Sequence, residues 1–316
     1  MVELNVPVKE MVAKKKRRPR IEDTKNTFNI FIHNRLAFTG FIITMIYFLI
    51  ALLDVVYPSW LGVSNINSML NWIPGGSPTS ALPTAPTTVG GWWYYLGTTY
   101  SLIPLFPVIL ASLEFDMGYS ALIVFSGLFI GLFLGTISGY YGGLIDEVVM
   151  RVTDVFFSFP TLVLAIAMSY VLGETMNTII IALIIIWWPS YARFSRGLAL
   201  TTRSQNFIEA AVASGSSRLR NAFVHVMPNV LSPIYVQLSL DLGSVVGILA
   251  TLDFIGFNKN GYLPELGNLI AQGQTFLASG TWWPVLVPGV FLLIFIVAVN
   301  LMGDGLRDVL DPKLRR

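Results

Sequence analysis

The sequence lacks cysteine and contains only two histidines, His33 and His225. Without cysteine there can be no disulfide, thiolate nucleophile, iron–sulfur cluster or cysteine-ligated zinc, and two histidines are too few for a multi-histidine metal centre. The phosphate-binding pattern G-x-x-x-x-G-K-[ST] is missing as well. We therefore predict no metal site and no catalytic residue in this chain, and we expect any nucleotide that supplies energy to be bound by another protein.

Charge is also scarce. Only 12% of the 316 residues are charged and 54% are hydrophobic, whereas soluble domains carry about a quarter charged residues. The mean hydropathy is +0.67, and the apolar residues fall in long uncharged runs separated by short polar stretches. A water-soluble fold has too little core volume to bury all of these runs. The composition excludes a soluble globular domain, a disordered chain and a nucleic-acid-binding protein, and it predicts a multi-pass protein of the cell membrane.

The apolar runs predict six membrane-spanning helices, because each is long enough to cross a bilayer and none alternates with a period of two. The fold class expected is an all-α integral membrane protein. The six predicted spans are Leu36–Tyr57, Gly118–Tyr140, Leu144–Leu172, Thr178–Leu200 (broken by Pro189), Val230–Phe257 and Trp282–Met302.

One further stretch, Tyr95–Leu113, is uncharged and nearly long enough to span, but it contains Pro104 and Pro107. We interpret it as an interfacial or re-entrant helix. It belongs to an extracytoplasmic loop expected over 58–117, in which positions 58–113 carry no charge. The first span is then residues 36–57, and residues 118–316 form the transmembrane core.

The basic residues predict the orientation, since cytoplasmic loops carry an excess of lysine and arginine. With six spans, 19 of the 20 lysines and arginines fall on one side and only Lys259 falls on the other. Both termini are therefore expected in the cytoplasm. The basic segment 1–35, with its run Lys14–Arg18, is interpreted as a topology determinant that touches anionic lipid rather than as a nucleic-acid arm.

Glycines recur every fourth residue through the second predicted span, which places them in one helical stripe where another backbone can approach closely. The stripe favours packing between spans of this chain, and a surface that slides against a moving neighbour is compatible with it. The glycines are Gly127, Gly131, Gly135, Gly139 and Gly143.

The polar connection at about 202–229 is predicted to contain two short helices. The first covers Phe207–Ser214 and stops at Gly215, a residue that commonly ends helices. Ser216 or Ser217 can cap the second, which is expected to end before Pro228. Two short helices in a cytoplasmic loop have little to pack on except a partner, so the segment is predicted to dock another protein.

Three blocks of residues then resemble one family. The loop residues Glu209, Ala210, Ala211, Gly215, His225 and Pro228 are similar to the EAA coupling loop of ABC importer permeases. The other two blocks resemble the dipeptide/oligopeptide/nickel type of permease, in its DppC/OppC branch. One block is Gly139–Gly143 followed by Asp146, Arg151, Asp154 and Phe159-Pro160. The other is Asn300–Asp308 followed by Leu310-Asp311-Pro312.

The resemblance implies a permease subunit with the type I (MetI-like) importer arrangement. It implies a second homologous permease subunit, two ABC ATPase subunits and an extracytoplasmic substrate-binding protein as partners, besides the lipid membrane. This chain would hold no cofactor, because ATP and Mg²⁺ would bind the ATPases. The loop at 202–229 would be the element that couples ATP hydrolysis to transport.

The sequence departs from the family pattern on the predicted outer side, where Asp253 replaces a usual serine and Leu96–Thr99 lacks the charged residues that usually follow. We name Asp253 and Asp241 as candidate residues of the substrate pathway. The expected substrates are peptides. Oligosaccharides carried by the same type of permease, and an ATPase-independent secondary transporter, are the alternatives.

The orientation is testable because the chain contains no cysteine. Single cysteines introduced as Ser77→Cys and Ser217→Cys should react with a membrane-impermeant maleimide from opposite sides, Ser77→Cys from outside intact cells and Ser217→Cys only after permeabilisation. Reaction of both variants from outside would contradict the six-span orientation.

Overall fold

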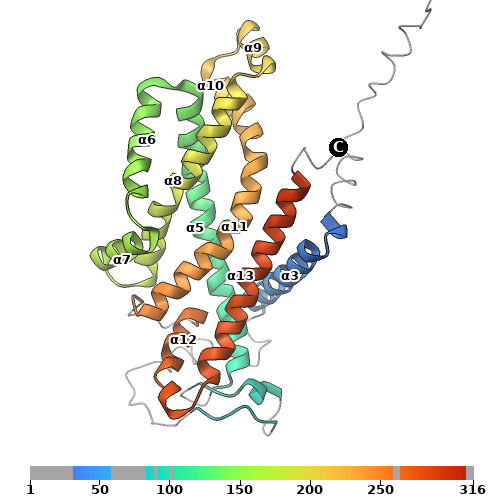
Figure 1. Cartoon of the computed structure of the whole chain (residues 1–316), viewed down its shortest axis with the longest axis vertical. Helices are drawn as coiled ribbons and strands as arrows, with labels where there is room; N and C mark the ends of the chain where they lie inside the picture. The colour runs from blue at the N-terminus through green and yellow to red at the C-terminus, as the bar shows by residue number, and fades with distance from the viewer. Residues whose placement is uncertain (1–30, 58–82, 89–91, 100–102, 259–263, 311–316) are drawn as a thin grey trace, which may run out of the picture.

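The computed structural model describes residues 31–57, 83–88, 92–99, 103–258 and 264–310. Most of the predicted basic segment, residues 58–82 of the predicted outer loop, and Lys259 lie outside this part of the chain. Within it the protein is helical, and the only β pairing is one isolated bridge between Thr98 and Pro104. The helices form an elongated bundle with α9 at one end and α12 at the other (Figure 1).

Among the described residues, five helices are long and apolar enough to cross a membrane, or six if the bent pair α6 and α7 counts as one span. The helices are α3 (Arg35–Val56), α5 (Leu105–Tyr141), α6 (Gly143–Phe157), α7 (Thr161–Leu172), α8 (Met176–Arg203), α9 (Asn206–Ala213), α10 (Arg218–Arg220), a π-helical turn (Asn221–Val226), α11 (Met227–Ile255), α12 (Leu266–Gln274) and α13 (Trp283–Leu310), with short 3₁₀ turns at Trp92–Leu96 and Leu277–Ser279.

The prediction of a separate interfacial or re-entrant helix over Tyr95–Leu113 is wrong for the residues of this stretch that the structure describes. Residues from Leu105 onward instead form the first turns of α5, which is 37 residues long. Proline is tolerated there, because Pro104 is the N-cap and Pro107 lies in the first turn, where backbone N–H groups have no partner within the helix. At 1.5 Å per residue α5 measures about 55 Å, well beyond the roughly 30 Å of a bilayer core.

The third predicted span is also not one straight helix. α6 and α7 meet at a break of about one turn and are bent by 90°. Pro160 is the N-cap of α7, and the residue before a proline is disfavoured in helical geometry, so the chain leaves the helix at this point. The fourth predicted span was expected to break at Pro189. In the structure α8 continues through Pro189 without a break.

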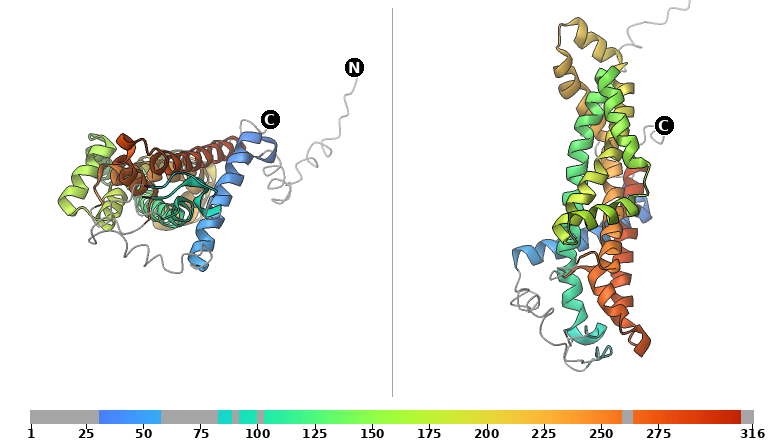
Figure 2. Two further views of the ribbon diagram at one scale, coloured as in Figure 1. Left: turned by 90° about the horizontal axis from the view of Figure 1, so that it is seen from below. Right: turned by 90° about the vertical axis from the view of Figure 1, so that its left-hand side faces the viewer.

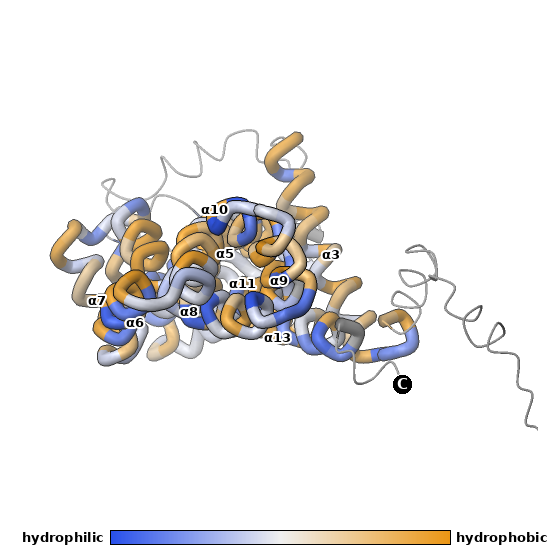
Figure 3. The backbone as a smooth tube through the Cα atoms, turned by 90° about the horizontal axis from the view of Figure 1, so that it is seen from above, coloured by the Kyte–Doolittle hydropathy of each residue, from blue (hydrophilic) through white to orange (hydrophobic). Residues whose placement is uncertain are grey.

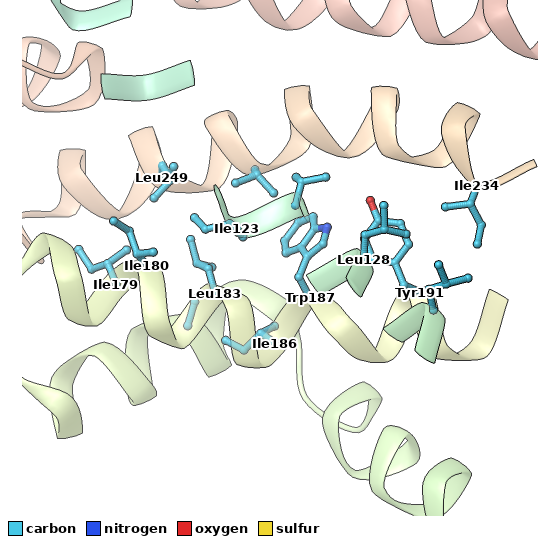
Figure 4. Packing of buried hydrophobic residues seen from close by; sticks show 14 of the residues in the cluster. Ile123, Leu128, Ile179, Ile180, Leu183, Ile186, Trp187, Tyr191, Ile234 and Leu249 are labelled. Atoms are coloured by element: carbon cyan, nitrogen blue, oxygen red, sulfur yellow. The ribbon is translucent and has the colours of Figure 1, made fainter. Parts of the chain in front are cut away.

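Two packed cores hold the bundle together. The first joins α5, α8 and α11 around large buried side chains such as Ile123, Leu183, Tyr191 and Leu249 (Figure 4). The second joins α3, α5, α12 and α13. α3 crosses the remaining helices obliquely, as both views of Figure 2 show, and its Gly40 lies against α13, where a Cβ would come 2.6 Å from the carbonyl oxygen of Ala298.

The glycine stripe lies in the contact between α5 and α8. A Cβ on Gly127 would lie 3.1 Å from the Cβ of Trp187, and one on Gly139 would lie 2.6 Å from the carbonyl oxygen of Arg196. Gly131 and Gly135 are packed still more closely against α8 backbone. Gly143 is different, because it has φ +61° at the start of α6 and a methyl group added to it would meet no atom within 4 Å. The stripe is thus a backbone-to-backbone contact along four of its five members.

This contact predicts a strong size limit at Gly135. In Gly135→Ala the new methyl group would lie 2.8 Å from the Cβ of Ser195 and closer to the Ala192 carbonyl, so α8 must shift. We expect a loss of about 1–3 kcal/mol of stability, measured by thermal unfolding in detergent. Gly118→Ala is the matched control, since it lies in the same helix with nothing within 4 Å. Equal melting temperatures for the two variants would contradict the contact.

Candidate functional site

The segment of α9 and α10 projects past the ends of α5 and α6 (Figure 2). Seen from this end, hydrophilic residues gather around α9 and α10, whereas α3 is mostly hydrophobic (Figure 3). Ile208 is the buried residue of α9, at 3% exposure, and joins the core of α5, α8 and α11. The helix is therefore anchored on one side chain and presents the rest of its surface outward.

Gly215 ends α9 in the way that its sequence predicts. The N–H of Ser216 donates to the carbonyl of Ala211 at 3.0 Å, and that of Gly215 donates to the carbonyl of Val212 at 2.9 Å, which is the Schellman pattern. This motif needs a left-handed residue, and Gly215 has φ +81° with open space around it. Ser217 then caps α10 by accepting from the N–H of Arg220 at 3.3 Å.

Three large apolar side chains are exposed on this projecting segment. Phe207 and Val212 on α9 are 42% and 53% exposed, and Leu219 on α10 is 63% exposed. Glu209 and Ala210 are exposed beside them, and Ala211 is half-buried. We call this set the α9–α10 surface.

A hollow of about 530 Å³ lies beneath this surface. Arg203 closes one side of it and donates from Nη1 to the carbonyl oxygens of Gly139 and Tyr140, both at 3.2 Å. It thereby satisfies carbonyls that the end of α5 leaves without a helical partner and ties that end to α8. The hollow is lined by Tyr140, Tyr141, Arg203, Ile208, Glu209, Val212, Ala213 and Arg218.

His225 and Pro228 do not line this hollow. Both belong to the continuous path from α10 through the π-helical turn into α11, so the second short helix does not end before Pro228 as predicted. Pro228 is the second residue of α11. His225 is half-buried, and its backbone carbonyl accepts a hydrogen bond from Asn229 at 2.6 Å.

Sequence reasoning missed the residues that fix this segment to the bundle. Asn221 is fully buried in the π-helical turn and its Nδ2 lies 3.5 Å from the carbonyl of Ser216. The ring of Phe223 packs on Phe133 of α5 at 5.3 Å between centroids. An asparagine four positions after the capping Ser217 was the one local signal, but nothing in the neighbouring residues says that it is buried.

Two ion pairs connect α6 to α8. Arg193 donates to Asp154 at 2.7 Å, and Arg196 binds Asp146 through two contacts of 2.5 and 2.6 Å. Arg151, which shares a helical face with Asp154 by spacing, instead lies 3.9 Å from Glu147 in an exposed pair. The pairs of Arg193 and Arg196 thus hold α6 against α8 within the chain.

The two candidate pathway residues are far from the α9–α10 surface and are buried. Asp241, at 7% exposure, accepts from Nε2 of Gln237 at 2.8 Å on the same helix. Asp253, at 4% exposure, lies at the other end of α11. The structure places both inside the bundle of this chain rather than on its surface. Among the described residues no group of three or more His, Asp or Glu side chains has metal-binding geometry.

A family model described as "Binding-protein-dependent transport system inner membrane component" matches residues 127–316. The chain belongs to this family. The match begins at the first glycine of the contact between α5 and α8 and includes the whole α9–α10 surface. The protein is therefore a multi-pass permease component of the cell membrane.

Individual relatives agree with this placement. The dipeptide transport system permease protein DppC of Haemophilus influenzae is 31% identical over 292 residues, covering 90% of this chain and 93% of that protein. The probable D,D-dipeptide transport system permease protein DdpC of Escherichia coli is 39% identical over 177 residues, covering 56% of this chain and 59% of that protein.

A solved structure supports the fold. An inward-facing form of the MetNI methionine ABC transporter matches with a TM-score of 0.53 at 20% identity, covering 65% of this chain and 98% of that one. The MetI-like arrangement predicted from the resemblance is thereby confirmed as the fold of the core.

Proposed function

We propose that this chain is one permease subunit of an ATP-driven importer of short peptides. The observation that carries the substrate class is the similarity to a dipeptide permease along 93% of that protein's length. The chain itself would perform no chemistry. It would form the translocation pathway with a second, homologous permease subunit and receive peptides from an extracytoplasmic binding protein.

The α9–α10 surface would bind the ATPase subunits, two per complex, which hold ATP and Mg²⁺. This rests on the geometry of the segment. It projects from the bundle, exposes apolar side chains beside Glu209, and is anchored to the core through Ile208. Motion of the ATPases would reach the spans because α10 runs through the π-helical turn directly into α11. Each state of the transporter would need different contacts at this surface.

The substrate class is tested by transport in proteoliposomes that contain the complete complex and its binding protein. We expect ATP-dependent uptake of labelled di- and tripeptides and no uptake of maltooligosaccharides. Liposomes without ATP provide the control. Uptake of an oligosaccharide in place of peptides would contradict the peptide assignment while leaving the permease class intact, and peptide uptake that persists without ATP would contradict the importer class.

Docking is tested at Gly215. Gly215→Val should reduce ATPase association and substrate-stimulated ATP hydrolysis by tenfold or more, because a β-branched residue pays about 1–2 kcal/mol or more in the left-handed conformation and shifts α9. Gly215→Asn should retain more activity, since asparagine tolerates this conformation. Ala211→Leu should also weaken association by adding bulk to the half-buried side of α9.

Gly280→Val is the matched control. Gly280 has the same φ of +81° and the same open surroundings, but it lies at the α12 end. It should lose similar stability and keep ATPase association. Normal stimulation in Gly215→Val, or an equal loss of association in Gly280→Val, would show that the α9–α10 surface is not the coupling element.

A further inference from the structure

Three carboxyl groups meet at the α12 end of the bundle, inside the protein. Asp116 comes from α5, Asp253 from the last turn of α11, and Glu265 immediately precedes α12. Their exposed fractions are 5%, 4% and 0%. A buried carboxylate is costly unless it is paired or hydrogen-bonded, so the partners of these groups decide their charge.

Two of the three carboxyl groups accept a hydrogen bond from a neighbouring amide. The backbone N–H of Leu266 donates to Oδ2 of Asp116 at 3.2 Å, and Nδ2 of Asn258 donates to Oε2 of Glu265 at 3.1 Å. The carboxyl groups of Asp253 and Glu265 lie within hydrogen-bonding reach of each other. Yet Oδ1 of Asp253 and Oε1 of Glu265 are buried and receive no hydrogen bond from any described residue. Two carboxylates can share a hydrogen bond only if one of them carries a proton.

The surroundings supply no positive charge among the described residues. None of the ion pairs in this part of the chain involves the three carboxyl groups. The other titratable group that faces all three is Tyr119 on α5, and Glu114 also lies near Tyr119. The helix α13, which packs on α11 and α12, has no ionisable residue from Trp283 to Gly303. Lys259 lies outside the described residues. It is the alternative source of a positive charge for these carboxyl groups, and the variant Lys259→Gln tests that alternative.

The backbone prevents the two carboxyl groups from moving apart easily. A Cβ on Gly267, two residues after Glu265, would lie 2.6 Å from the Cα of Ala250 on α11. The start of α12 is therefore pressed against α11 just where the carboxyl groups meet. Burial and the nearby charge of Asp253 raise the pKa of Glu265 above its ordinary value.

We propose that Asp253 and Glu265, with Asp116 beside them, form a proton-binding site that joins α11 to α12 and makes this end of the molecule sensitive to pH. With the proton bound, the pair shares a hydrogen bond and α12 stays on α11. When the proton leaves, two anions face each other in a buried site and the contact weakens. Because the folded protein holds this proton more tightly than the unfolded chain, the stabilisation is complete at acidic pH and is lost as the pH rises through the raised pKa of Glu265.

The direct test is infrared spectroscopy of the full-length chain in detergent at pH 7. The wild type should show the C=O band of a protonated carboxyl group, and this component should disappear in Glu265→Gln and in Asp253→Asn, because the amide then donates to the remaining carboxylate. Asp304→Asn, an exposed carboxyl on α13, should leave the band unchanged. A wild-type spectrum whose protonated-carboxyl band is absent, or unaffected by both variants, overturns the proposal.

Stability gives the second measurement. The melting temperature of the wild type and of Asp304→Asn should fall between pH 6 and pH 9, whereas Glu265→Gln and Asp253→Asn should show about half that slope or less. If Lys259 were the counter-charge, both carboxyl groups would be ionised, no protonated band would appear, and Lys259→Gln would destabilise the protein at every pH. That result rejects the proton-binding site. Should the two amide variants fail to fold, the wild-type spectrum recorded at pH 7 and at high pH still decides.

Discussion

The close approach of α5 and α8 is the constraint on which the other contacts depend. Without side chains at Gly131, Gly135 and Gly139, the two helices touch backbone to backbone. In a membrane, where lipid is as apolar as the helix surface, such packing is a main source of helix association. The ion pairs of Arg193 and Arg196 with α6, and the hydrogen bonds from Arg203 to the end of α5, all extend from the same helix.

α11 connects the two ends of the molecule that carry unusual chemistry. At one end it continues the π-helical turn, whose buried Asn221 and packed Phe223 hold the α9–α10 surface in place. At the other end it carries Asp253 and stops at Gly256, which has φ +92°. A π turn often marks a functional position in a helix. A displacement of α10 would therefore pass through the π-helical turn and along α11 toward the proton-binding pair, without crossing a loop.

Local sequence signals predicted the elements whose geometry depends on neighbours along the chain. The end of α9 at Gly215 follows from hydrogen bonds within a few residues, so residue type is sufficient. The cap of α10 was narrowed to Ser216 or Ser217, and the structure selects Ser217. The apolar runs located all of the candidate spans, because length and hydropathy are properties of the run itself. Proline was a poorer guide, since its effect depends on whether it falls in a first turn, as in α5, or in a helix interior that tolerates it, as in α8.

The sequence by itself determined that this is a helical membrane protein, and its motifs pointed to the permease family and to the loop that contains two short helices. Only the tertiary structure decided which charges meet. Asp154 pairs with Arg193 rather than Arg151, and Asp253 faces Glu265, which lies twelve positions later in the chain. The 90° bend between α6 and α7 was likewise visible only in the tertiary structure. Such choices depend on packing between distant helices, because the partner of a buried group is set by what the fold brings beside it and not by its place in the chain.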